Sequence, residues 1–281
     1  MNPSIGLQLW SIRNSLQKDY VGTLETIAKT GYKNLELITN VQPDGLVFGE
    51  SMRAPELRKH LDELGLRAVS SHFVPTADMD LEKIVGDCQV LGVTSLGCAI
   101  AFFTDPAQTA EFCRTFNHYA EVCKKGGVQL YYHNHFHEFQ IFGEKSVYEL
   151  LIEQLDRDLV MFEFDTYWAA RGGQDPIYWL KKLGKRCDLL HQKDLPASVA
   201  QANLFHRFGY DSQITIDTFW GLQDPQEFIE VGEGVLPLAA IFEAFRKYNG
   251  ARYVFIEQDM TRRTEAASIK VSLENLTRIL G

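Results

Sequence analysis

The sequence predicts an α/β fold, a single-domain (β/α)8 barrel of the TIM type with a long insertion after the seventh strand. Eight strand-like runs alternate with helix-like runs, and such alternation is typical of parallel strands joined by right-handed crossovers. The chain has 281 residues, which exceeds the roughly 250 of a typical barrel by about one insertion. No change of composition divides residues 1–281, so we expect one domain.

The first half of the chain holds five predicted strands. Predicted helices end at glycines such as Gly31, Gly65 and Gly92, and Pro55 lies in the first turn of its helix, as helix signals require. In order, strand 5–10 precedes a helix that ends at Gly31, strand 33–37 precedes helix 54–64, strand 67–73 precedes helix 81–91, strand 94–99 precedes helix 105–125, and strand 128–133 follows.

The second half continues the alternation. Helix 147–155, strand 159–164, a helix opened by Asp175-Pro176, strand 189–193, an irregular stretch 195–236, helix 238–248, strand 253–257 and helix 265–280 complete the chain. A doubly wound open sheet is the rival architecture. The count of eight units and the absence of a Gly-x-Gly-x-x-Gly turn after the first strand weigh against it.

Composition limits the classes of partner. The net charge of −9 argues against a nucleic-acid partner, which usually needs a basic face. Five cysteines without a Cys-x-x-Cys pair indicate reduced thiols and a reducing compartment. No apolar run approaches the length that spans a bilayer, so we expect a cytoplasmic protein without a membrane partner.

Metal-type ligands follow four of the predicted strands. Glu138, Asp165, His191 and Glu257 come after strands five to eight, at separations of 27, 26 and 66 residues. The C-terminal ends of barrel strands meet at one rim, so these side chains can converge on one ion. Carboxylates and imidazole without thiolate suit Mn, Zn, Co or Mg, and we favour Mn. Taken singly, an acidic residue at a strand end is usually a helix cap or an ion-pair partner.

Histidines add to the same rim. His133 and His135 are two residues apart and share one side of a strand. Either is a candidate ligand beside or in place of Glu138, although we favour contacts that orient the ligands or bind substrate hydroxyls. His72 ends the third strand and is either a substrate contact or a buried structural histidine.

Other side chains near the strand ends suit a carbohydrate. Lys193 shares the side of His191 and is placed either to hold an oxyanion or to pair with Asp194. Trp10 and Trp168 follow strand ends, where aromatic faces suit sugar rings or simply fill the barrel mouth.

Three runs resemble one known family. The His-Asn-His-x-His-Glu-Phe run at 133–139, Phe164-Asp165-Thr166-Tyr167-Trp168 and His191-Gln192-Lys193-Asp194 are similar to the xylose-isomerase-like barrel superfamily of sugar phosphate isomerases and epimerases. The resemblance covers nearly the whole chain. It implies a divalent metal held by Glu138, Asp165, His191 and Glu257, with the two glutamates as acid–base groups. Epimerases of this family often carry a histidine at the position of Trp168. The departure favours a branch acting on keto-sugars, keto-glycosides or inositol-like ketones.

We therefore expect a metal-dependent sugar or sugar phosphate isomerase or epimerase, in which Glu138 and Glu257 move protons through a metal-stabilised enediolate. A dehydratase or keto-glycoside lyase on the same site is the nearest alternative. A sugar-binding barrel without turnover is the alternative of another class, and a DNA-repair enzyme is disfavoured by the acidic charge. The substrate partner is a small carbohydrate. Aromatic residues of the insertion, Phe205 and Trp220, are placed either to cover the site or to meet a second subunit of a homo-oligomer.

Overall fold

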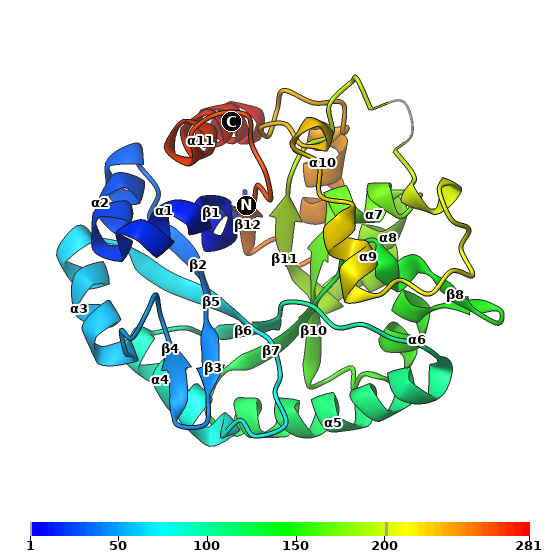
Figure 1. Ribbon diagram of the computed structural model, residues 1–281, viewed down its shortest axis with the longest axis horizontal. Helices are drawn as coiled ribbons and strands as arrows, with labels where there is room; N and C mark the ends of the chain where they lie inside the picture. Colours follow the sequence, from blue (N-terminus) through cyan, green and yellow to red (C-terminus); the bar gives the residue numbers. More distant parts are fainter. Residues whose placement is uncertain (1, 200–201) are drawn as a thin grey trace.

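Eight parallel strands close into a barrel (Figure 1). The computed structural model describes residues 2–199 and 202–281. The first strand pairs in parallel with both the last and the second, which closes the ring. The barrel is confirmed, and the open sheet is excluded. Its strands are β1 (Ser4–Gln8), β2 (Asn34–Ile38), β5 (Arg67–Phe73), β6 (Ser95–Cys98), β7 (Gln129–His133), β10 (Val160–Asp165), β11 (Cys187–Gln192) and β12 (Tyr253–Ile256).

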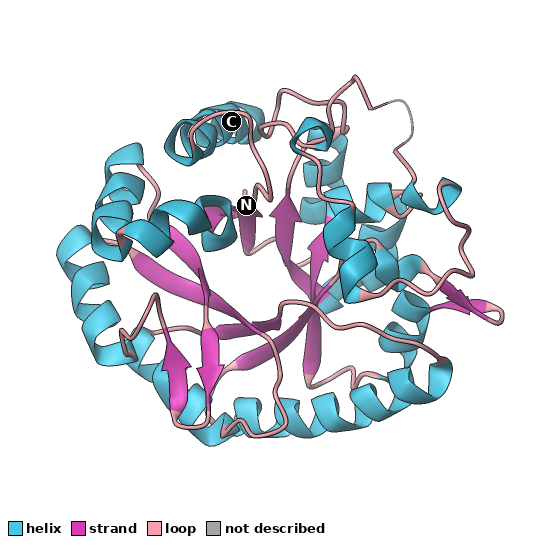
Figure 2. Ribbon diagram, viewed as in Figure 1, coloured by secondary structure: helices cyan, strands magenta, loops and turns pink. Residues whose placement is uncertain are grey.

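Helices surround the strands on the outside (Figure 2). Four of them have the predicted bounds, namely α3 (Ala54–Leu64), α4 (Leu81–Leu91), α10 (Leu238–Tyr248) and α11 (Glu265–Leu280). The first two end at a glycine in the left-handed region: φ is 64° at Gly65 and 77° at Gly92. The α-helices outside the stretch 195–236 are α1 (Arg13–Lys18), α2 (Tyr20–Thr30), α3 (Ala54–Leu64), α4 (Leu81–Leu91), α5 (Pro106–Lys125), α6 (Val147–Gln154), α7 (Thr166–Arg171), α8 (Pro176–Leu183), α10 (Leu238–Tyr248) and α11 (Glu265–Leu280).

Short elements account for most differences from the prediction. They are the hairpins β3 (Asn40–Gln42) with β4 (Gly45–Val47) and β8 (Ile141–Phe142) with β9 (Lys145–Ser146), the 3-10 turns η1 (Leu9–Ile12), η2 (His137–Phe139), η3 (Gly184–Arg186), η4 (Leu204–His206) and η5 (Pro225–Glu227), and helix α9 (Ile216–Gly221). The stretch predicted as irregular, 195–236, contains η4, α9 and η5. Part of that stretch, residues 200–201, lies outside the described residues.

The barrel interior changes character along the strands. Tyr131, Leu189 and Phe255 form a separate apolar cluster inside the barrel. Two residues further along the same strands lie His133, His191 and Glu257, which are also buried. Because side chains alternate between the two faces of a strand, these positions share the inward side. Inside the barrel, a layer of apolar side chains therefore lies next to a layer of polar side chains at the C-terminal ends of the strands.

Two features of the whole chain bear on the composition argument. All five cysteines are buried and free of disulfides. Among residues 2–199 and 202–281, no helix has both the length and the apolar character needed to cross a membrane.

Candidate active site

Four donor side chains converge at the C-terminal end of the barrel. Single ligand atoms of His133, Asp165, His191 and Glu257 all lie within 4.8 Å of one another, and all four residues are buried. They come from β7, β10 and β11 and from the residue directly after β12. Neighbouring parallel strands thus deliver one side chain each to the same point.

Local contacts fix the orientation of Asp165. Its Oδ1 accepts a hydrogen bond of 2.7 Å from the backbone N–H of Trp168, so it caps α7. Its Oδ2 lies 2.5 Å from Nζ of Lys193, on the side of the donor group. The Asn134 side chain bonds to both the N–H and the C=O of Asp165, at 3.0 and 3.3 Å. One carboxylate oxygen is therefore used for the fold, and the other is turned to the site.

A second polar layer lies against the ring of His191. Its Nε2 lies 2.5 Å from Glu36 Oε2, and its Nδ1 lies 2.8 Å from Glu257 Oε2. The His72 Nε2 lies 2.6 Å from Glu163 Oε2 and 3.4 Å from Glu36 Oε2. Glu163 is two residues before Asp165 and so faces the same side of β10.

The electrostatics separate the histidines. Burial lowers the pKa of His133 well below its usual value, and the neighbouring His191 adds to that effect. Burial would also lower the pKa of His191, but the carboxylates of Glu163, Glu36 and Glu257 outweigh it and raise that pKa well above its usual value. His133 is therefore a neutral imidazole, and its Nδ1 has no hydrogen-bond partner within the described part of the chain.

Lys193 lies beside Glu257 and Asp259 and affects the pKa of both. Lys193 Nζ lies 2.5 Å from Glu257 Oε2 and 3.8 Å from Asp259 Oδ1. Burial opposes ionisation of Glu257, yet Lys193 and His191 hold its pKa well below the usual range. Burial raises the pKa of Asp259 to about 7, against the opposing charge of Lys193. Two carboxyl groups that are two residues apart therefore differ in their affinity for a proton.

The donor set fits a divalent cation. Five carboxyl groups that are at most 7% exposed gather here: Glu36, Glu163, Asp165, Glu257 and Asp259. Within residues 2–199 and 202–281, the side chains in ion-pair contact with them are one lysine, Lys193, and two histidines, His72 and His191. Unbalanced buried charge is costly, so a further positive charge would stabilise the group. Two imidazoles and two carboxylates are also ligands that Mn²⁺, Zn²⁺ and Co²⁺ accept.

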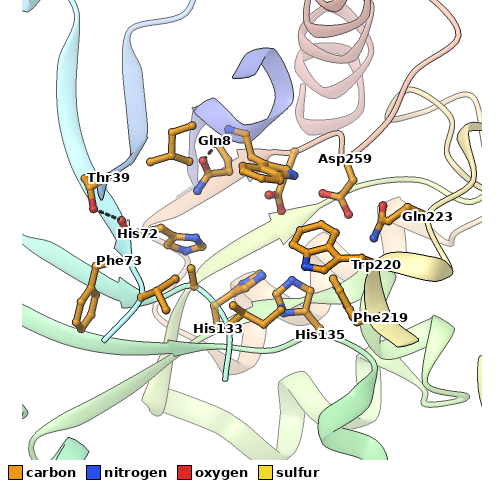
Figure 3. Close-up of a pocket in the computed structure, with 16 residues that line it drawn as sticks. Gln8, Thr39, His72, Phe73, His133, His135, Phe219, Trp220, Gln223 and Asp259 are labelled. Atoms are coloured by element: carbon orange, nitrogen blue, oxygen red, sulfur yellow. Dashed lines mark hydrogen bonds between the residues drawn. The ribbon is translucent and has the colours of Figure 1, made fainter. Parts of the chain in front are cut away.

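A cavity of about 190 Å³ opens above this layer (Figure 3). The polar side chains among its lining residues are those of Gln8, Thr39, His72, His133, His135, Gln223, Glu257 and Asp259. Its apolar walls include Trp10, Ile38, Val74, Ile100, Phe219 and Trp220. In Figure 3 the three histidines lie across the cavity from Asp259. A polar floor beneath apolar walls suits a small polyhydroxylated molecule.

Glu138 lies outside the donor group. It belongs to η2, after the end of β7. Its Oε1 accepts a hydrogen bond of 2.7 Å from the Tyr132 hydroxyl, and its Oε2 accepts one of 2.8 Å from the N–H of His135. Tyr132 alternates with the inward-facing Tyr131 and His133, so it directs Glu138 toward the outer core rather than to the barrel axis. His133 is the β7 side chain in the group instead.

Most of the other expected substrate-binding and catalytic residues line the cavity, namely Trp10, His72, His133, His135 and Glu257.

Trp168 and Lys193 are buried outside the lining. The Trp168 ring packs 5.6 Å from that of His135, and the Lys193 ammonium lies 5.6 Å from the Trp168 ring centroid. Lys193 pairs with Asp165 and Glu257 rather than with Asp194, which was the alternative.

The two insertion aromatics also differ in position. Trp220, at the end of α9, lines the cavity and is 46% exposed, whereas Phe205 is buried in the core.

Sequence reasoning missed four acidic or polar members of the site. Glu36 and Glu163 are the last residue but one of predicted strands, between Leu35 and Leu37 and between Phe162 and Phe164. A carboxylate within such an apolar run is itself a signal, because Asp and Glu are seldom buried without a partner. The others, Gln8 and Asp259, lie two residues from the predicted site residues Trp10 and Glu257. The period of two along a strand is the signal that could have found them.

With this fold and site, the chain belongs to the xylose isomerase-like TIM barrel family, whose model matches residues 24–279. Among curated proteins it is 28% identical to an inosose dehydratase of Geobacillus kaustophilus (strain HTA426), over 57% of this chain and 49% of that protein. The chain thus spans about half the length of that relative.

Solved structures share the whole fold. A sugar phosphate isomerase/epimerase from Parabacteroides distasonis ATCC 8503 has a TM-score of 0.75 and 26% identity, and the match covers 98% of this chain and 94% of that one. The IOLI protein, whose structure holds a zinc atom, has a TM-score of 0.68 and 12% identity over 99% of this chain and 98% of its own. The second likeness is one of fold alone.

Proposed function

We propose that this protein is a divalent-metal-dependent lyase of the dehydratase type, acting on a polyhydroxylated ketone such as a keto-sugar or an inosose. One observation carries the proposal. Glu257 and Asp259 both line the cavity, and Glu257 also belongs to the donor group. A group that can accept a proton therefore lies beside a position where a carbonyl oxygen can be polarised.

We propose His133, Asp165, His191 and Glu257 as the ligands, with His133 in the place first expected for Glu138. The proximity of their ligand atoms and the excess of buried carboxylates support this set. We favour manganese or zinc, which accept two imidazoles and two carboxylates. When bound, such an ion would polarise the substrate carbonyl and make the adjacent C–H bond more acidic.

The position of Glu138 favours elimination over epimerisation. An epimerase that works by proton transfer needs acid–base groups on opposite faces of the reacting carbon. Glu138, the predicted second group, is engaged by Tyr132 and by the N–H of His135. Elimination needs only one base and one acid. In this proposal Glu257 removes the C–H proton, and Asp259 delivers a proton to the departing hydroxyl group.

The experiment combines product analysis with two variants. Metal-loaded protein is incubated with an inosose in heavy water, and the products are followed by NMR and ultraviolet absorbance. We expect loss of water with formation of a C=C bond. Glu257→Gln should reduce turnover by about 10²-fold or more. Asp259→Asn should slow water loss while deuterium still enters next to the carbonyl. Full turnover by Glu257→Gln would contradict the assignment.

An isomerase or epimerase is the second candidate. The likeness to the Parabacteroides distasonis sugar phosphate isomerase/epimerase over almost the full length of both chains favours it. In that case deuterium would enter the product without loss of water, and a stereoisomer or an isomeric sugar would appear. Binding of the ketone with neither exchange nor elimination would instead indicate a sugar-binding barrel.

A further inference from the structure

We infer that the ligand of this cavity carries no phosphate group and is an uncharged polyhydroxylated ketone. The inference deepens the proposed function, on which its choice of a ketone rests. It is supported by the charges that line the cavity, by the backbone amides of the loop after β11, and by the pairing of Lys193 after β11 and of Arg263 after β12.

The cavity offers no lysine or arginine side chain to a phosphate, and His72 in its wall is already paired with Glu163. Among the described residues that line it, none is lysine or arginine, while Glu257 and Asp259 both carry a carboxyl group. Glu36, Glu163 and Asp165 lie buried in the layers next to it. Against these five carboxyl groups, Lys193, the two histidines of raised pKa (His72 and His191) and one divalent ion do not make this region positive. A phosphate dianion would therefore meet charges of its own sign over short distances.

Backbone amides of the loop after β11 bind a carboxylate of the same chain, that of Asp194. In barrels of this type, a substrate phosphate is frequently held by backbone amides of the loops after strands seven and eight. Here the Asp194 carboxylate fills that role: its Oδ2 accepts from the N–H groups of Gly232 and Gly234, both at 3.0 Å, and its Oδ1 accepts from that of Leu236 at 3.1 Å.

The fit around Asp194 is tight. A Cβ on Gly234 would lie only 2.3 Å from Asp194 Oδ1. The Asp194 carboxylate also accepts a hydrogen bond of 2.9 Å from the N–H of Leu195. Its two oxygens are thus held by four N–H groups, and these amides are not available to a phosphate.

Cations of the neighbouring loops are likewise engaged. Lys193 lies 2.5 Å from both Asp165 and Glu257. Arg263, in the loop after β12, lies 3.4 Å from Glu230 and 3.0 Å from Glu233. A phosphate would have to break these pairs to gain a cation, and the displaced carboxylates would then lack partners.

The first arm of the test compares a matched pair of ligands. Calorimetry on Mn-loaded protein is run with D-fructose and with D-fructose 6-phosphate, and deuterium exchange from heavy water is measured for both. We expect the phosphate ester to bind at least tenfold more weakly than D-fructose. Equal or tighter binding of the ester would overturn the inference. If both ligands bind but neither exchanges deuterium, and an inosose does not react, the proposed reaction fails while the binding ratio still decides the inference.

The second arm uses inorganic phosphate and decides the case even where neither sugar binds. Thermal unfolding of metal-free protein is followed with and without phosphate. We expect no phosphate-dependent stabilisation of the wild type but a rise in Tm for Asp194→Ala, because the amides at 232–236 become free. Asp224→Ala is the control, since Asp224 caps η5 through a single N–H in the same connection. Stabilisation of the wild type by phosphate, displaced by D-fructose 6-phosphate, would contradict the inference.

Discussion

The orientation of His191 depends on a residue that is not itself a proposed ligand. Both ring nitrogens of His191 face carboxylates, Glu36 at 2.5 Å and Glu257 at 2.8 Å, so the ring cannot turn without losing one of them. Gln8 donates a hydrogen bond of 2.7 Å to the same oxygen of Glu36 and fixes it in turn. A carboxylate behind a ligating histidine sets its ring orientation and raises its basicity. Glu36 therefore positions His191, one of the proposed metal ligands.

We predict that Glu36→Gln lowers the affinity for Mn²⁺ or Zn²⁺ by about 10- to 100-fold, the usual effect of losing such a partner. The measurement is calorimetry on chelator-stripped protein. Glu56→Gln, at an exposed position of α3, is the matched control and should bind the metal as the wild type does. An unchanged affinity in Glu36→Gln would show that His191 is held by other contacts.

At the scale of elements, strand ends were predictable and the paths of loops were not. The period of two along a strand places His133 and His135, or His191 and Lys193, on one side. The sequence predicts Glu138 as a metal ligand because its 27-residue separation from Asp165 matches one strand–helix unit. The chain instead makes the 3-10 turn η2 after β7, and a hydrogen bond to Tyr132 turns Glu138 outward. The spacing of residues along the chain gives no information about that hydrogen bond.

One glycine shows how strand pairing makes room for the site. Gly97 of β6 is in register with His72 of β5. A Cβ at Gly97 would lie 2.8 Å from His72 Cδ2 and 3.3 Å from Glu163 Oε2. A side chain here would press on the buried His72–Glu163 pair. The polar layer therefore requires glycine at this position.

We predict that Gly97→Ala lowers the free energy of unfolding by about 1–3 kcal/mol, the usual cost of overpacking a filled interior. Urea unfolding followed by circular dichroism measures it. Gly86→Ala is the matched control: Gly86 lies inside α4, where an added Cβ meets nothing within 4 Å. That substitution should stabilise the protein by about 0.5–1 kcal/mol. Equal effects of the two substitutions would contradict the packing argument.

At the scale of the molecule, the repeated alternation was sufficient to predict the closed barrel. Long amphipathic helices such as α4 and α11 carry their own start and stop signals, so their bounds follow from the sequence. The β3–β4 hairpin and α9 are short, and such segments depend on contacts made elsewhere in the fold. Glu36 was missed for a related reason, because its partners Gln8, His72 and His191 come from three other strands.

Metal removal should lower the stability of the whole molecule, because the buried carboxylates repel one another when no bound cation offsets their charge. Free metal at about 100 times its Kd adds about 2.7 kcal/mol to the free energy of unfolding. For a chain of this size, each kcal/mol corresponds to about 2–4 °C in Tm. We therefore predict that a chelator lowers Tm by about 5–10 °C relative to Mn-saturated protein, as measured by calorimetric scanning. Asp165→Asn, which retains an N-cap residue for α7 but loses a ligand oxygen, should show no such difference. A Tm that is the same with and without metal in the wild type would remove the support for a metal centre in this barrel.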